Sequence, residues 1–118
     1  MGYESKLYVV DKCSIPASDD KHLYAQVVAM FDLCKAGIHR SNFRDTDCAF
    51  YADDGNTLVL EDCYGDSIGE LTIPEVIKLI EDQQKECPEY RRWEPCLALL
   101  KSFKEDEWKN LVVLHYGY

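Results

Sequence analysis

The sequence predicts an α+β fold in which a mainly antiparallel sheet of about five strands packs on two helices. Two observations carry this prediction: a hairpin signal in the middle of the chain and a strongly capped helix that follows it. No strand–helix–strand alternation, the pattern of a parallel sheet, is visible along the 118 residues. We therefore expect the order β-β-β-β-α-α-β within a single domain that spans residues 1–118.

The first part of the chain carries strand patterns. Residues 5–12 are rich in β-branched and aromatic side chains, and a turn-like segment follows at residues 14–20. Residues 23–34 fit both a helical stripe and an unbroken apolar alternation. We favour a strand, because six consecutive matches to a period of two place those side chains on one face of a sheet. The alternating side chains are Leu23, Ala25, Val27, Ala29, Phe31 and Leu33.

The middle of the chain predicts a β-hairpin. Residues 48–52 and 57–61 flank the tetrapeptide Asp53-Asp54-Gly55-Asn56. Asp-Gly and Gly-Asn pairs supply the positive φ angles that tight hairpin turns require. The same loop lacks the alternating oxygen ligands and the terminal glutamate of a calcium-binding loop, so a turn is the better interpretation.

Two helices and a last strand follow the hairpin. Thr72 and Glu75 have the spacing of a capping box, so we expect a helix over residues 72–87 that Pro88 ends. A second helix is expected over residues 93–103, and an apolar run at residues 111–116 predicts a final strand. The buried stripe of the second helix is expected to contain Trp93, Cys96, Leu97 and Leu100.

The charge of the chain is unevenly distributed. The net charge of −9 opposes direct binding of nucleic acid, because neutralising phosphates requires surplus cations. Residues 41–89 contain 13 acidic and three basic residues, and residues 45–77 contain no lysine or arginine at all. Such segregation carries a repulsive cost that a surface of mixed charge avoids. The acidic segment therefore either solubilises the protein or binds a basic partner.

On the second interpretation, the acidic residues around the hairpin and the loop after it form the partner-binding patch. The candidates are Asp45, Asp47, Asp53, Asp54, Glu61, Asp62, Asp66 and Glu70. A secondary contact is expected where two arginines adjoin aromatic rings, at Tyr90, Arg91, Arg92 and Trp93. For the arginine pair, a contact with the acidic first helix is the plainer alternative.

Enzymatic signatures are weak. The nearest candidate is a divalent-metal site on Asp62, Asp66 and Glu70, but these residues fall in a glycine-containing loop and their spacing is not diagnostic. The chain has no phosphate-binding loop, dinucleotide fingerprint or nucleophile elbow. The six cysteines lack the close pairs of zinc sites and are expected to be free thiols, while His115 is expected to be a packed or edge histidine. We expect no cofactor, no metal and no catalytic residue.

Three segments of the chain carry a family resemblance: the opening Met-Gly-Tyr-Glu-Ser-Lys-Leu-Tyr-Val-Val, the central Tyr51-Ala52-Asp53-Asp54-Gly55-Asn56-Thr57, and the closing Leu111-Val112-Val113-Leu114-His115-Tyr116-Gly117-Tyr118. With these segments the chain resembles small uncharacterised acidic proteins carried by phages and prophages of Gram-positive bacteria. The resemblance implies a host-takeover role, and among such proteins are anti-CRISPR proteins that occupy the nucleic-acid channel of a CRISPR effector. The resemblance implies no catalytic residues for this chain.

Together these observations predict a non-enzymatic inhibitor that binds a basic nucleic-acid-binding host protein, such as a CRISPR effector nuclease, and competes with its DNA or RNA. The alternatives are a small metal-dependent enzyme or nucleotide-binding protein, and a phage structural or assembly protein. The chain shows neither an export signal nor an apolar stretch of about 20 residues that could span a bilayer, so a location in the host bacterial cytosol, without membrane contact, is expected.

Overall fold

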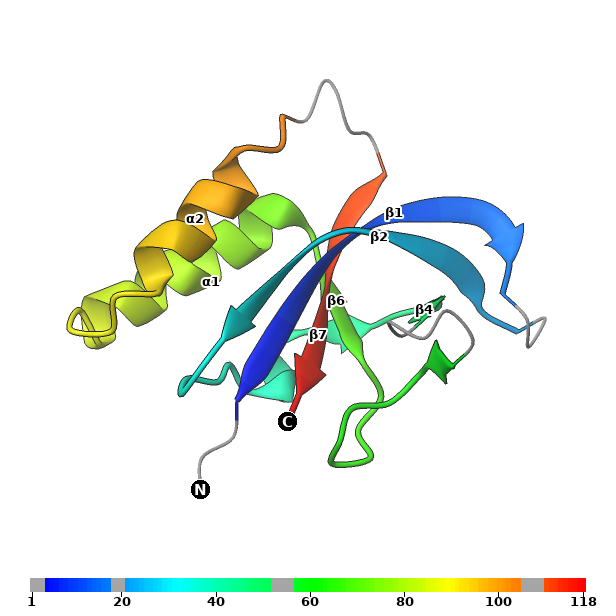
Figure 1. Cartoon of the computed structure of the whole chain (residues 1–118), viewed down its shortest axis with the longest axis horizontal. Helices are drawn as coiled ribbons and strands as arrows, with labels where there is room; N and C mark the ends of the chain where they lie inside the picture. The colour runs from blue at the N-terminus through cyan, green and yellow to red at the C-terminus, as the bar shows by residue number, and fades with distance from the viewer. Residues whose placement is uncertain (1–3, 18–20, 52–56, 105–109) are drawn as a thin grey trace.

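Seven strands and two α-helices make up the part of the chain that the computed structural model describes, which is residues 4–17, 21–51, 57–104 and 110–118 (Figure 1). The elements are β1 (Ser5–Pro16), β2 (Leu23–Leu33), the 3-10 helix η1 (Arg40–Asn42), β3 (Arg44–Asp45), β4 (Cys48–Tyr51), β5 (Leu58–Val59), β6 (Gly69–Leu71), α1 (Ile73–Glu86), α2 (Trp93–Lys101) and β7 (Leu111–Gly117). The predicted α+β class is therefore confirmed.

The strands form one mixed sheet in the order β3-β6-β7-β1-β2-β4-β5. The pairing of β1 with β2 and with β7 is antiparallel, whereas β2 and β4 run parallel. The prediction of about five strands was too low because β3 and β6 have only two and three residues. Strands this short carry too few side chains for a period of two to be recognised.

Apolar residues cover both faces of the sheet. On one face, Leu7, Val9 and Val113 pack with buried residues of the two helices. Figure 1 shows α1 and α2 side by side against this part of the sheet. On the opposite face, Val10 and Leu114 belong to a second, smaller cluster to which β4 also contributes. Side chains of neighbouring positions on β1 and β7 thus enter different cores, as the strand period requires.

The ambiguous segment at residues 23–34 is a strand, so the helical alternative was wrong, but its apolar side chains do not share one face. Val9 pairs with Ala29 and Val10 pairs with Val27, which leaves Val28 as an extra residue in a β-bulge. The bulge shifts the alternation by one residue. The later apolar side chains, Ala29, Phe31 and Leu33, join the helix-facing core, and Leu23 and Ala25 join the second core.

The hairpin and both helices form where the sequence places them. β4 and β5 pair antiparallel, while the predicted turn at residues 53–56 lies outside the described residues. Thr72 accepts a hydrogen bond from the Glu75 backbone N–H and the Glu75 carboxylate accepts one from the Thr72 backbone N–H, which completes the capping box. The predicted buried stripe of α2 is confirmed.

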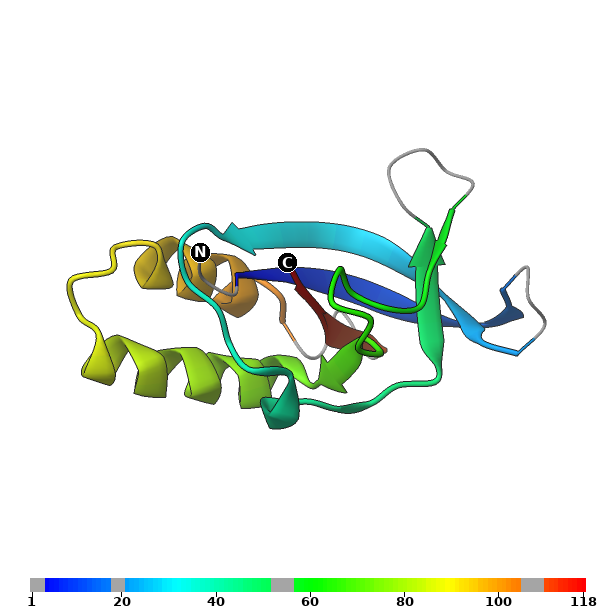
Figure 2. The same cartoon turned by 90° about the horizontal axis from the view of Figure 1, so that it is seen from below.

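The first strand is longer than predicted. It continues through part of the segment interpreted as a turn and ends at Pro16, which pairs with Leu23 of β2. A second register shift between Lys12 and Pro16 accommodates this extension. The long β1–β2 ribbon therefore extends beyond the helices (Figure 2).

Candidate interaction surface

The predicted acidic residues differ widely in their surroundings. Asp53 and Asp54 lie outside the described residues. Asp45 and Asp47 expose 95% and 64% of their side chains, and Glu61 and Asp66 are also exposed. Asp62, in contrast, is buried and Glu70 is half-buried. We refer below to Asp45, Asp47, Glu61 and Asp66 as the acidic surface.

Arg40 joins two parts of the acidic surface that are distant in sequence. Its guanidinium donates to the Asp45 carboxylate over 2.8 Å and to the Ser67 carbonyl over 2.6 Å. Asp45 of β3 pairs with Gly69 of β6, and β6 directly follows the loop that carries Asp66 and Ser67. A Cβ atom at Gly69 would lie 2.5 Å from the Cβ of Phe43, so the close approach of the chains requires glycine. Asp45 is thereby fixed beside the loop that carries Asp66.

Asp62 organises the turn that presents Glu61 and Asp66. One carboxylate oxygen, Oδ1, accepts hydrogen bonds from the backbone N–H groups of Tyr64 at 2.9 Å and Asp66 at 3.1 Å. A bridge between Glu61 and Ser67 closes the base of the turn. The other oxygen, Oδ2, is buried and has no hydrogen-bond partner among the described residues. Asp62 thus acts here through the backbone, whereas its neighbours point their charges into solvent.

Glu70 is largely neutralised. Its carboxylate lies 3.0 Å from the Lys12 ammonium and accepts a 2.7 Å hydrogen bond from the Thr46 hydroxyl. Burial opposes the charge of Lys12, but the hydrogen bond to Glu70 and the nearby negative charges outweigh it and raise the lysine pKa. Asp47 lies 3.6 Å from the same ammonium. The ammonium group of Lys12 therefore neutralises part of the negative charge of Glu70 and Asp47.

The described residues contain one cluster with metal-ligating atoms, formed by Asp47, Cys48 and Glu70, whose ligand atoms lie within 4.8 Å of one another. Lys12 already supplies a cation to its two carboxylates. Burial raises the pKa of the Cys48 thiol to about 11, so the sulfur remains protonated at neutral pH. This geometry fits an ion pair better than a divalent metal. The sequence-predicted alternative on Asp62, Asp66 and Glu70 is not brought together in the described part of the chain.

The aromatic and basic segment after α1 fastens the helices to the end of β2. Trp93 is buried and its indole N–H donates to the Cys87 carbonyl, while the Tyr90 hydroxyl donates to the Cys34 carbonyl over 2.6 Å. The guanidinium of Arg92 donates to the Asp32 carbonyl, so the alternative of an arginine pair facing the first helix is wrong for this residue. The fourth predicted secondary contact, Arg91, has an exposed side chain.

Sequence reasoning missed a buried polar network between the two ends of the chain. The Ser5 hydroxyl lies 2.8 Å from Nε2 of His115 and accepts a hydrogen bond from the Ile38 backbone N–H. Burial lowers the pKa of His115 to about 4, although the nearby Asp62 carboxylate acts in the opposite direction. Serine, histidine and aspartate are also the residues of hydrolase triads. Here Ser5 and His115 are both 0% exposed, so the hydroxyl cannot reach a substrate.

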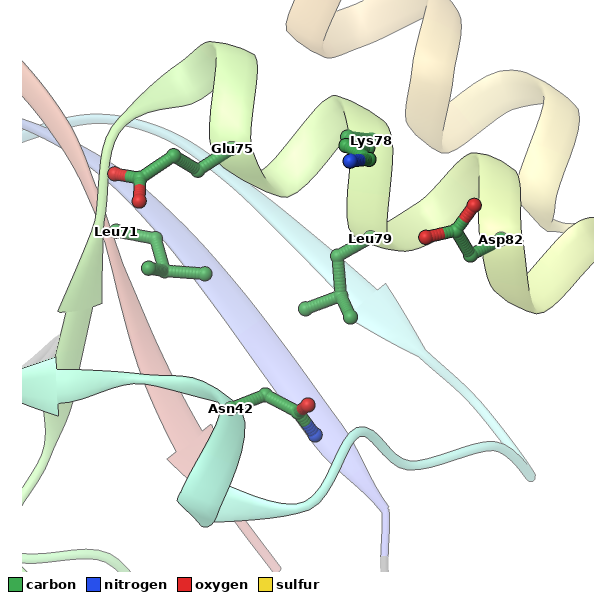
Figure 3. Close-up of a pocket in the computed structure, with 6 residues that line it drawn as sticks. All are labelled: Asn42, Leu71, Glu75, Lys78, Leu79 and Asp82. Atoms are coloured by element: carbon green, nitrogen blue, oxygen red, sulfur yellow. The ribbon is translucent and has the colours of Figure 1, made fainter.

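A shallow pocket lies between α1 and η1 (Figure 3). Its volume is about 270 Å³, and it is lined by Asn42, Leu71, Glu75, Lys78, Leu79 and Asp82. The Glu75 carboxylate already accepts two hydrogen bonds from the guanidinium of Arg44, at 2.7 and 2.9 Å. Together with the capping hydrogen bonds, they lower the pKa of Glu75 to about 2. The pocket shares no residue with the acidic surface.

Comparisons with protein-family models, curated proteins and solved structures find no match for this chain. Within the described ranges, neither helix has the length and apolar character required to cross a membrane.

Proposed function

We propose that the protein is a non-enzymatic inhibitor that uses the acidic surface to bind a basic, nucleic-acid-binding protein. The observation that carries the proposal is the exposure of four carboxylates: Asp45 in β3, Asp47 between β3 and β4, and Glu61 and Asp66 in a hydrogen-bonded turn. A bacterial host protein such as a CRISPR effector nuclease is the partner class that the phage resemblance suggests.

The charge balance favours a cationic partner. Six described carboxylates, the four of the acidic surface with Asp62 and Glu70, lie near three cations, Lys12, Arg40 and Arg44, and Arg44 is already paired with Glu75. A surplus of about four negative charges therefore attracts cations and steers their approach, over a screening length of about 10 Å at 0.1 M salt.

The arrangement also favours competition with nucleic acid. A channel that holds DNA or RNA is lined with lysine and arginine, which satisfy phosphate charges without reading sequence. The Asp62 hydrogen bonds fix the backbone of the turn that carries Glu61 and Asp66, so this backbone loses little conformational freedom when the two carboxylates take the place of phosphates in such a channel. The binding of this protein and the binding of nucleic acid are then mutually exclusive.

A charge-reversal capture experiment tests the proposal. The wild-type protein, the double variant Glu61→Lys/Asp66→Lys and the control Glu86→Lys/Glu94→Lys would be immobilised and incubated with a bacterial lysate. All four side chains are exposed, so both variants change the net charge equally with little expected effect on folding. We expect the wild type and the control to retain basic nucleic-acid-binding proteins that elute with rising salt, and the reversed surface to lose them.

The alternatives give different results. Capture that is equal for all three proteins, and insensitive to salt, would mean that the carboxylates only solubilise the chain. A saturable thermal shift with Mg²⁺ or Mn²⁺ that Asp66→Asn abolishes would favour the metal-dependent enzyme, because binding to the native state alone raises its stability.

A further inference from the structure

The outer edge of β2 pairs with another described strand over only a small part of its length. β2 has 11 residues, and its pairing with β4 covers only Leu23 and Tyr24. At the other end, the Asp32 carbonyl is occupied by Arg92. Between these points, at residues 25–31, no described strand pairs with this edge, which follows the upper margin of the sheet in Figure 2.

Apolar exposure is concentrated at this edge. The described residues include four large hydrophobic side chains that are exposed, and three of them are Val27 at 38%, Val28 at 37% and Met30 at 46%. Residues 23–31 contain no charged side chain, although charged residues make up 30% of the chain. Natural edge strands are usually protected by lysine, proline, a β-bulge or a covering element, because free backbone groups otherwise pair with another strand. Residues 25–31 contain no lysine or proline, and the bulge at Val28 is the device that this edge carries.

The backbone groups that face the open edge can be assigned from the register. The Leu23 N–H donates to the Asp47 carbonyl on the β4 side, so by alternation Ala25 and Val27 also face outward. The outward carbonyl of Asp32 likewise places the N–H and C=O groups of Met30 on this side. The extra residue of the bulge, Val28, interrupts the alternation of outward-facing and inward-facing backbone groups. The outward positions Val27 and Met30 are therefore three residues apart instead of two.

This spacing selects the partner. A regular strand offers pairing groups at every second residue and loses register across a three-residue interval. An antiparallel second copy of β2 presents the same three-residue interval in reverse, so Val27 of each copy meets Met30 of the other around an axis between Val28 and Ala29. The absence of charge along the edge removes the repulsion that a net charge of −9 would otherwise impose there.

We propose that the protein forms a two-fold symmetric dimer in which the β2 edges of two copies pair antiparallel through Val27 and Met30. The pairing is isologous, so the assembly closes after two copies. The opposite edge of each sheet, formed by β3 with Asp45, takes no part in this strand pair. This dimer is independent of the proposed inhibitory function.

Sedimentation equilibrium of the full chain, over a wide range of protein concentration, tests the dimer. The first variant, Val28→Lys, places two ammonium groups beside the axis, and we expect the dimer dissociation constant to rise at least about tenfold. The second variant, Met30→Pro, removes an outward N–H that makes no bond to β1, so it weakens the dimer without removing an intramolecular hydrogen bond. Tyr64→Lys is the matched control, because Tyr64 is the fourth exposed large hydrophobic residue and lies outside β2.

The expected result is a dimer for the wild type and Tyr64→Lys, weakened by both β2 variants, with slow amide exchange at Met30 only when the dimer is present. A wild type that remains monomeric at all concentrations would overturn the proposal. So would a dimer that survives both β2 variants while circular dichroism shows them folded, since the contact would then lie elsewhere. If a β2 variant does not fold, the protection of the Met30 amide in the wild type decides alone.

Discussion

Acidification to about pH 4.8 should weaken the fold through His115. The unfolded histidine has a pKa of 6.5, whereas burial lowers the folded value to about 4. Between these values the unfolded chain binds more protons than the folded one, so stability is highest above pH 6.5 and falls as the pH falls. Each pKa unit corresponds to 1.36 kcal/mol. The loss between about pH 7 and pH 4.8 is therefore about 2 kcal/mol.

Urea unfolding at the two pH values, followed by circular dichroism, measures this loss. His115→Gln is the comparison, because glutamine retains an amide near the Ser5 hydroxyl but does not titrate in this range. His22 and His39 are present in both proteins, so their contributions cancel. Most of the loss from the low pKa of Glu75 comes below about pH 4.5, outside the chosen window. Equal losses of stability in the two proteins, or a folded His115 pKa near 6.5 by NMR, would refute the buried neutral imidazole.

Two further predictions concern packing and thiol reactivity. Gly69→Ala should lower the free energy of unfolding, measured by urea titration, by about 1–3 kcal/mol, because the added methyl group would collide with Phe43. An unchanged free energy of unfolding would show that β6 can move away from Phe43 at no cost. In the native protein at neutral pH, Cys48 and Cys96 should react with a thiol reagent far more slowly than in urea, since burial raises their pKa values to about 11 and about 12. Rapid labelling of either thiol in the native state, mapped by mass spectrometry, would contradict the buried placement.

Local signals in the sequence were sufficient for the elements that local chemistry determines. The capping box of Thr72 and Glu75 and the proline after Cys87 delimit α1 within one residue, because each signal acts over a single helical turn. The apolar run that became β7 was recognised for a similar reason, since seven residues are enough to show strand character.

Other features depend on contacts that no local pattern reveals. The bulge at Val28 arises from the pairing of β2 with β1, so the sequence alternation continued through it without a break. The environment of each carboxylate was likewise not predictable. Lys12 approaches Asp47 and Glu70 from a distant part of the chain, and Arg40 links Asp45 to the remote Ser67 carbonyl. Asp62 accepts backbone hydrogen bonds and is buried. A count of charges along the sequence identifies an acidic region but not which of its members reach solvent.

The central claim is that the acidic surface displaces nucleic acid from a basic partner. Its most direct measurement is the fraction of labelled DNA or RNA bound by a purified captured partner as the concentration of this protein rises. We predict that the wild type and Glu86→Lys/Glu94→Lys displace the nucleic acid completely, and that Glu61→Lys/Asp66→Lys requires at least about tenfold more protein. Nucleic acid that stays bound while this protein binds the same partner, or displacement that the reversed charges leave unchanged, would contradict the claim.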